Sequence, residues 1–277
     1  MHIRCLGSRG GLPVSGPDFT KYGGDTTCIE IIAKSGDVII IDAGSGIRTL
    51  NGKSSNNSTH NLLFTHSHLD HLMGFPFFAP LYKEQNIINI YGYPTCLGGY
   101  SQVLKMLMTD PYFPAEFSTL PSNISFCDLD MSPFSIGSVH ITSVYLNHPN
   151  GGLGYRFEEQ GKSFVFLTDN ELNHHHPGGG ELDTYADFSK DADLLIHDAE
   201  FCQNEHTIFK GWGHSYYIDA VDLALEANAA KLGLFHINAR RTDEQMDRIE
   251  EKAQQYIKNE DSSLDCFAVG TGFEMEL

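Results

Sequence analysis

The sequence predicts an α/β fold with two β-sheets inside a coat of helices. Three observations support this prediction. The first expected strands form hairpins, later strands alternate with expected helices, and several buried strands end directly on a potential metal ligand. Because no linker or change in composition divides the 277 residues, we expect them to form one domain, residues 1–277.

Short apolar runs bounded by turn residues predict the strands of the N-terminal half. Residues 38–41, Val-Ile-Ile-Ile, are apolar on both faces and therefore typical of a buried strand. We expect a polar loop over residues 53–60 and an amphipathic helix over residues 97–108. The expected strands of this half cover residues 2–6, 28–33, 37–41, 61–64 and 87–91.

The C-terminal half contains the alternating strands and helices. A helix is expected over residues 217–228, and a closing helix should begin after a cap at Thr242 or Asp243. The expected strands cover residues 124–127, 139–146, 153–157, 164–168, 192–196, 231–235 and 264–269.

Acidic residues outnumber basic residues by two to one. Lys and Arg total 18 and Asp and Glu total 36, which gives a net charge of −18. A long polyanion needs a basic surface that releases counterions, and this chain has little basic charge to form one. We therefore expect no long nucleic acid as a partner, whereas small anions can still bind at a metal centre.

Cysteine usage and hydropathy indicate the compartment. The six cysteines show no close pair and no regular spacing, which predicts reduced thiols, mostly buried, in a cytoplasmic protein. No apolar run approaches the length of a membrane span, and the N-terminus lacks the apolar core of a signal peptide. We therefore expect no membrane association.

Residues 65–71 read Thr-His-Ser-His-Leu-Asp-His and contain four potential metal ligands, His66, His68, Asp70 and His71. The apolar run before them predicts a buried strand, and residues 72–75 predict the start of a helix. The ligands should therefore lie in a strand-to-helix turn, where loops carry chemistry on a rigid scaffold.

Asp42, His148, Asp169 and His236 each follow another expected strand closely. Since strand ends along one sheet edge converge, these residues can share one site with the cluster in residues 65–71. Taken alone, Asp42 is equally well interpreted as a helix N-cap, and the others as capped strand ends or core histidines. The set as a whole indicates a site. The histidines at 174–176 precede glycines and are expected in a mobile surface loop outside it.

The candidate ligands can be divided between two divalent ions. Imidazole and carboxylate ligands suit zinc best, with manganese and iron as alternatives. Two ions about 3.5–4 Å apart would share a hydroxide nucleophile and clamp the oxygens of an in-line displacement. The first ion would be held by His66, His68 and His148, and the second by Asp70, His71 and His236, with Asp169 bridging both.

The order of these motifs resembles that of the metallo-β-lactamase-fold hydrolases over nearly the whole chain. The resemblance implies an αββα sandwich, in which two mixed β-sheets are flanked by helices and a binuclear site lies at one edge. It also implies a catalytic role for Asp70 beside its role as a ligand. The matching positions are Asp42, His66, His68, Asp70, His71, His148, Asp169 and His236.

Two further motifs resemble the phosphodiesterase branch, which includes tRNase Z and cyclic-nucleotide phosphodiesterases. They are Leu-Ile-His-Asp-Ala at 195–199 and Gly-His-Ser at 213–215. The resemblance implies that Asp198 orients His214, which donates a proton to the leaving oxygen, as an alkoxide leaving group requires. The alternative is that His214 caps a helix and Asp198 merely ends a strand. No long basic arm for gripping tRNA is evident, which together with the acidic charge argues against tRNA processing.

We therefore expect a phosphodiesterase that cleaves a small nucleotide-type diester, with 3′,5′-cyclic nucleotides as the best candidates. One alternative is a hydrolase of lactones, carboxylic esters or thioesters at the same metals. A second is a metal-dependent sensor or binding domain without catalysis. Aromatic residues in 75–82 are expected mainly in the core, whereas residues 112–117 are expected to form an irregular aromatic loop, a candidate cover of the site. Both segments also suggest a homodimer contact.

Overall fold

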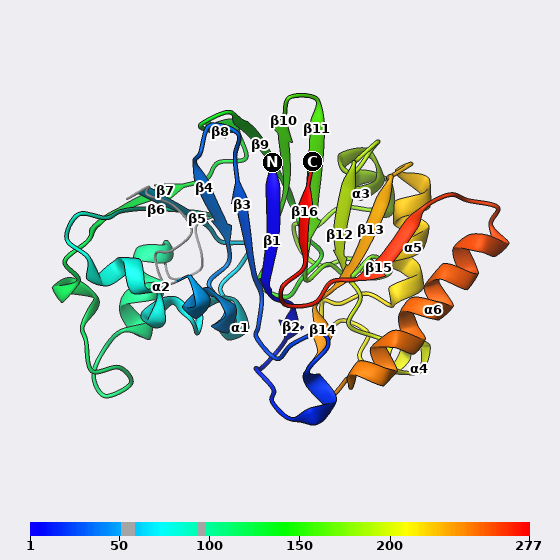
Figure 1. Ribbon diagram of the computed structural model, residues 1–277, viewed down its shortest axis with the longest axis horizontal. Coiled ribbons are helices and arrows are strands. Elements are labelled where there is room, and N and C mark those ends of the chain that lie inside the picture. The colour runs from blue at the N-terminus through cyan, green and yellow to red at the C-terminus, as the bar shows by residue number, and fades with distance from the viewer. Residues whose placement is uncertain (51–58, 94–97) are drawn as a thin grey trace.

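The computed structural model describes residues 1–50, 59–93 and 98–277. Two seven-stranded β-sheets lie side by side in the centre of Figure 1, and helices cover their outer faces. Parallel and antiparallel strand pairs occur in both sheets. The predicted αββα sandwich of two mixed sheets is therefore confirmed.

The first sheet has the strand order β16-β1-β3-β4-β5-β6-β7. Strands β4 to β7 are parallel, whereas β16, β1, β3 and β4 pair antiparallel. The pairing of β1 with β16 brings the two ends of the chain together (Figure 1). The strands are β1 (His2–Gly7), β3 (Cys28–Ile32), β4 (Val38–Ile41), β5 (Thr59–Leu63), β6 (Ile87–Gly92), β7 (Asn123–Asp128) and β16 (Glu274–Glu276).

The second sheet has the order β15-β13-β12-β11-β10-β9-β8. Strands β11, β12, β13 and β15 are parallel, and β8 to β11 form antiparallel hairpins. A short parallel pair, β2 (Arg9–Gly10) with β14 (Ile237–Asn238), connects the two halves of the chain. The strands are β8 (Phe134–Ile136), β9 (Val139–Tyr145), β10 (Leu153–Glu159), β11 (Lys162–Leu167), β12 (Leu194–Asp198), β13 (Lys231–Phe235) and β15 (Asp265–Ala268).

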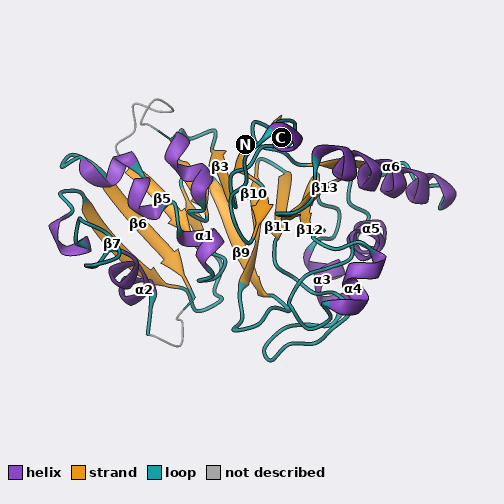
Figure 2. Cartoon of the chain, turned by 90° about the horizontal axis from the view of Figure 1, so that it is seen from below, coloured by secondary structure: helices purple, strands orange, loops and turns teal. Residues whose placement is uncertain are grey.

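Helices α1 and α2 cover the first sheet, and α3, α5 and α6 cover the second (Figures 1 and 2). Of the two caps predicted for the closing helix, the structure has Thr242, whose hydroxyl accepts a hydrogen bond from Gln245 N. The helices are α1 (Leu69–Leu72), α2 (Tyr100–Leu107), α3 (Leu182–Phe188), α4 (Gln203–Ile208), α5 (Tyr217–Glu226) and α6 (Asp243–Asn259). Short 3₁₀ helices cover Pro17–Phe19, Ser45–Thr49, Phe75–Phe77, Ala79–Tyr82 and Phe117–Thr119.

Alternating side chains on each strand fill two different layers of the core. On β11, Phe164 and Phe166 point into the core between the sheets, whereas Val165 and Leu167 pack in the core under α3, α5 and α6. A third core lies between the first sheet and its helices. Both faces of the central strands are thus buried, which explains why their sequences are apolar throughout.

The structure departs from the predicted elements mainly at short segments. The helix after the histidine cluster begins at Leu69 and not at residue 72, and α2 begins at Tyr100. Residue 97 and most of the predicted loop at 53–60 lie outside the described residues, and His60 belongs to β5. Strands β2, β8, β14 and β16 and helices α3 and α4 were not predicted, because segments this short show little hydrophobic period.

In the part of the chain that the structure describes, no helix is both long and apolar enough to cross a membrane. The cysteines of the described residues are free thiols, as predicted, although Cys127 is exposed. Cys96 lies outside those residues.

Candidate active site

The strand ends of both sheets meet at one edge of the sandwich. Strands β4 and β5 lead into Asp42 and the cluster at residues 65–71, and β9, β11 and β13 lead into His148, Asp169 and His236. In Figure 1, α1, which carries Asp70 and His71, and β14, which follows His236, lie at the same end of the molecule. The predicted convergence of these residues is therefore observed.

Three of these residues have a backbone conformation that is uncommon for side chains other than glycine. The φ angles are +60° at Asp42, +54° at Asp169 and +56° at His236. Each residue comes directly after a strand or one residue later, where the chain turns sharply. Such strain persists where the surroundings fix it, and it is frequent at functional sites.

His66, His68 and His148 form the first group of potential ligands. One nitrogen of each lies within 4.8 Å of the others, and His148 Nε2 is 3.0 Å from His68 Nδ1. The Nδ1 of His148 lies 3.0 Å from the carbonyl oxygen of Gly213 and donates to it. This hydrogen bond leaves His148 Nε2 available as a ligand atom.

Asp70, His71 and His236 form the second group, and their ligand atoms also lie within 4.8 Å of one another. Asp70 Oδ2 lies 3.2 Å from His236 Nε2 and 3.5 Å from His71 Nε2. The backbone N–H of Gly11 donates to Asp70 Oδ2 over 2.7 Å and fixes the carboxylate. The two predicted groups are thus both present as clusters of side chains.

Asp169 lies between the two groups. Its Oδ1 is 3.7 Å from His66 Nε2 and 3.9 Å from His148 Nε2 in the first group. In the second group, its Oδ1 is 3.3 Å from His236 Nε2 and its Oδ2 is 3.3 Å from His71 Nε2. This position is the one that a bridging carboxylate needs.

Asp42 contacts His71 of the second group on the side of the ring that faces away from the other ligands. Its Oδ2 accepts hydrogen bonds from His71 Nδ1 at 2.8 Å and from the Thr65 hydroxyl at 2.7 Å, and its Oδ1 accepts one from Thr65 N at 2.8 Å. The interpretation of Asp42 as a helix N-cap is wrong, because the 3₁₀ helix Ser45–Thr49 begins after Gly44 without a side-chain cap. The carboxylate instead holds the His71 ring so that Nε2 faces the cluster.

The cluster has the chemistry of a site for divalent cations. His66 Nε2 and His71 Nε2 are buried and have no hydrogen-bond partner among the described residues. Burial lowers the pKa of His71, but Asp169, Asp70 and Asp42 raise it well above its usual value. Burial raises the pKa of Asp70, but His71 and His236 lower it below its usual range. Buried carboxylates thus favour added positive charge, and the imidazole and carboxylate ligands fit divalent ions.

His214 and Asp198 lie beside both groups. His214 Nδ1 is 2.8 Å from Asp198 Oδ2, and Asp198 is fully buried. Helix α5 begins after Tyr216, so His214 does not cap it, and the pairing with Asp198 is the arrangement observed. Burial lowers the pKa of His214, but Glu200 and then Asp198 outweigh burial and raise it to about 9.

Sequence reasoning assigned no role to Glu200. Its Oε2 lies 3.1 Å from His236 Nδ1 and 3.4 Å from His214 Nδ1, and its Oε1 accepts a hydrogen bond from Asn238 Nδ2 at 2.8 Å. Glu200 therefore orients His236 of the second ligand group and places a negative charge beside His214. Its position two residues after Asp198, past a buried strand, is a signal that could have indicated it.

One of the three histidines at 174–176 is not at the surface, where all three were expected. His175 is exposed, but His176 is buried and its Nε2 lies 2.9 Å from Glu171 Oε2. Glu171 also accepts hydrogen bonds from Gly211 N at 2.7 Å and Gly213 N at 2.8 Å. The placement of His176 in a surface loop was therefore wrong, because its carboxylate partner anchors the loop that precedes His214.

Several known proteins are similar to this chain in sequence or in fold. The profile of the beta-lactamase superfamily domain matches residues 38–237. Ribonuclease Z of Haloarcula marismortui is 24% identical over 285 residues, covering 87% of each chain. The structure of the metallo-beta-lactamase fold protein YhfI from Bacillus subtilis has a TM-score of 0.72 at 18% identity, covering 100% of this chain and 98% of its own. The structure of human tRNase Z, short form, has a TM-score of 0.66 at 18% identity, covering 100% of this chain and 99% of its own.

These similarities correct one prediction. The expectation that no long nucleic acid is a partner is wrong, because a ribonuclease is similar along most of the chain and a tRNase shares its fold. The net charge of −18 is a sum over the whole chain. It does not describe the local field at a site where bound cations would reverse the charge.

Proposed function

Because this chain belongs to the beta-lactamase superfamily, we propose that it is a phosphodiesterase that holds two divalent ions, with zinc as the best fit. Family membership confirms the predicted resemblance, and with it the prediction of a metal-dependent hydrolase. The observation that carries the choice of phosphodiester chemistry is the pairing of the buried Asp198 with the partly exposed His214.

The ligand side chains would bind the ions and align the substrate phosphate. His66, His68 and His148 would hold one ion, Asp70, His71 and His236 the other, and Asp169 would bridge them. When bound, the ions supply a water of lowered pKa and neutralise charge on the phosphate oxygens. Asp42 and Glu200 keep the ring nitrogens of His71 and His236 in place through hydrogen bonds.

His214 is in position to donate a proton to the leaving oxygen. Among the described residues, its contacts with Asp198, Glu200 and Asp169 all run through Nδ1, which leaves Nε2 for the substrate. Its ring centroid lies 5.3 Å from that of His148 and 4.8 Å from that of His236, so it adjoins both ligand groups. A hydrolase of lactones or thioesters has less need of such an acid, since its leaving groups can be stabilised by the metal.

The proposed substrates are nucleotide-type diesters. 3′,5′-Cyclic nucleotides are the first candidates, as small diesters whose alkoxide leaving group requires a proton. An RNA 3′ extension is the second candidate, because the relative from Haloarcula marismortui is a ribonuclease Z. Both candidates release a ribose oxygen. His214 would donate a proton to this oxygen as it leaves.

One substrate panel tests the proposal. Protein loaded with zinc or manganese is assayed on bis-p-nitrophenyl phosphate, 3′,5′-cyclic nucleotides, a tRNA precursor with a 3′ extension, a lactone and a thioester, with bound metal measured in parallel. We expect cleavage of at least one diester. The proposal would be refuted if metal-loaded protein cleaved the lactone or the thioester but no diester. If protein with full metal content cleaved none of the substrates, a metal-dependent sensor would be favoured.

A further inference from the structure

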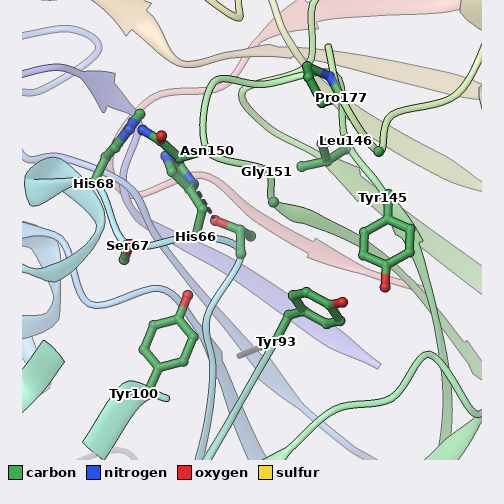
Figure 3. A pocket seen from close by; sticks show the side chains of 13 residues that line it. His66, Ser67, His68, Tyr93, Tyr100, Tyr145, Leu146, Asn150, Gly151 and Pro177 are labelled. Atoms are coloured by element: carbon green, nitrogen blue, oxygen red, sulfur yellow. Dashed lines mark hydrogen bonds between the residues drawn. The ribbon is translucent and has the colours of Figure 1, made fainter. Parts of the chain in front are cut away.

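A cavity of about 710 Å³ opens beside the first ligand group. His66 and His68 form one wall, and Figure 3 shows Tyr93, Tyr100 and Tyr145 around the remaining space. Its lining contains none of the second ligand group and neither Asp198 nor His214. The cavity therefore extends from the phosphate position on the side of the first group, apart from the proposed acid.

Two tyrosines from different sheets form the outer part of this cavity. Tyr93 follows β6 of the first sheet, and Tyr145 ends β9 of the second. Their ring centroids are 5.2 Å apart and their planes meet at 89°, which leaves ring faces open to a ligand. Tyr93 is 41% exposed, although a large aromatic ring is usually covered. Exposed rings at the mouth of a cavity are typical of a binding surface.

Tyr100 forms a fixed inner wall. It is buried, and its ring stacks on Phe64 with centroids 4.6 Å apart and planes at 9°. In Figure 3 its hydroxyl points into the cavity toward Ser67. The side chain of Asn150 lies on the opposite side near His68. The cavity thus offers aromatic faces together with a few hydrogen-bonding groups, a common composition of small-molecule sites.

The chemistry of the lining selects a planar, uncharged group. No lysine or arginine is among the described residues that line the cavity, so it lacks the cations that a second phosphate would need. Its volume exceeds that of a nucleoside, and aromatic side chains stack on nucleobases of any sequence. A nucleobase therefore fits the lining better than an anion or an aliphatic chain.

We propose that this cavity binds the base of the nucleoside that keeps the phosphate after cleavage. This inference rests on the proposed phosphodiesterase function. In the hydrolysis, a water molecule loses one proton to solvent as its oxygen forms a new bond to phosphorus, and the opposite ester P–O bond breaks with its electron pair on the leaving oxygen. The leaving oxygen takes a proton from His214, which regains one from solvent, and the nucleoside in the cavity departs as a phosphate monoester. Tyr93 and Tyr145 would be specificity-determining residues.

The first test measures binding. Metal-loaded protein is titrated calorimetrically with AMP and with inorganic phosphate, for wild type, Tyr93→Ala, Tyr145→Ala and Tyr145→Phe. The control is Tyr112→Ala, which removes an exposed tyrosine outside the cavity. We expect the alanine variants at 93 and 145 to weaken AMP binding about tenfold or more, because stacking contributes strongly to base binding. Binding of inorganic phosphate, Tyr145→Phe and the control should stay close to wild type.

The second test measures turnover of two chromogenic diesters with the same leaving group, thymidine 5′-(p-nitrophenyl phosphate) and methyl p-nitrophenyl phosphate. Tyr145→Ala should lower kcat/KM for the thymidine ester about tenfold and leave the methyl ester unchanged. Equal losses on both esters, or AMP binding no tighter than phosphate in the wild type, would overturn the inference. Failure of wild type on both esters and on every diester of the substrate panel, with normal AMP selectivity, would refute the phosphodiesterase function while the base site stands.

Discussion

His214 Nδ1 lies 2.8 Å from Asp198 Oδ2, and this contact joins the end of β12 to the loop before α5. Asp198 also accepts hydrogen bonds from Asn170 N at 3.3 Å and Glu200 N at 2.9 Å, so its carboxylate is fixed by three neighbours. The rigid partner sets the direction in which the His214 ring presents Nε2. Catalysis by a proton donor depends on this geometry before it depends on pKa.

Substitution of His214 should affect chemistry more than metal binding. His214→Ala is expected to lower kcat on a diester with an alkoxide leaving group about 10²- to 10⁴-fold, the usual contribution of a general acid. A p-nitrophenyl diester, whose leaving group needs no proton, should lose far less. Metal content is measured alongside, and His140→Ala, at an exposed position in β9, is the control. Equal losses on both kinds of diester would contradict the role of acid.

Asp198→Asn should shift the pH dependence of the same reaction. Asp198 is one of the carboxylates that raise the pKa of His214 above its usual value. An acid is active while protonated, so activity is lost as the pH rises through its pKa. Removing the charge lowers that pKa, and the loss should begin at lower pH in the variant than in the wild type. The measurement is a kcat–pH profile, with Asp130→Asn at an exposed position as the control. An unchanged alkaline limb in Asp198→Asn would argue against coupling between the Asp198 charge and the pKa of His214.

Gly213→Ala should disturb the first ligand group. Gly213 has φ +92°, and a Cβ there would lie 2.0 Å from His148 Nδ1, so the imidazole would have to move. Gly161→Ala imposes a similar backbone strain at φ +77°, with no atom within 4 Å of its Cβ. We expect Gly213→Ala to bind zinc more weakly than Gly161→Ala at similar thermal stability, as measured by competition with a chromogenic chelator. Equal zinc affinity in the two variants would show that the contact has no effect.

Asp42→Ala should weaken the second ligand group without touching the substrate. The buried carboxylate orients His71 through a 2.8 Å hydrogen bond. Loss of such a partner typically costs about 10- to 100-fold in metal affinity. Equilibrium dialysis should show lower affinity for one ion, with the other ion nearly unaffected. Equal weakening of both ions would indicate general destabilisation instead.

Metal removal should lower the thermal stability of the fold. Ions that bind the native cluster stabilise the folded state by about 2.7 kcal/mol at a free concentration 100 times Kd. They also offset the repulsion among the buried carboxylates Asp70 and Asp169. Calorimetry with and without a chelator should therefore give a lower Tm for the chelated protein. His71→Ala should reduce that difference, whereas the exposed His175→Ala should not.

Much of the site could be predicted from the sequence because it consists of local patterns. A buried strand followed by a polar residue and a turn is visible in sequence, as at Val38–Ile41 before Asp42 and Lys231–Phe235 before His236. Such strand ends meet at one edge of a sheet. The order of the candidate ligands was therefore sufficient to indicate which residues come together. Net charge was a poor guide to partners, since it averages over the whole surface.

The sequence by itself determined the fold class and the candidate ligand groups, because strand period and strand-end chemistry are properties of short segments. The candidate acid, His214, came from the resemblance of residues 195–199 and 213–215 to the phosphodiesterase branch. Only the tertiary structure decided what surrounds them. Glu200 beside His236, Glu171 with His176, and the cavity between Tyr93 and Tyr145 all join residues through packing between separate elements. Their partners follow from how the two sheets and their loops fit together, and no local pattern encodes that fit.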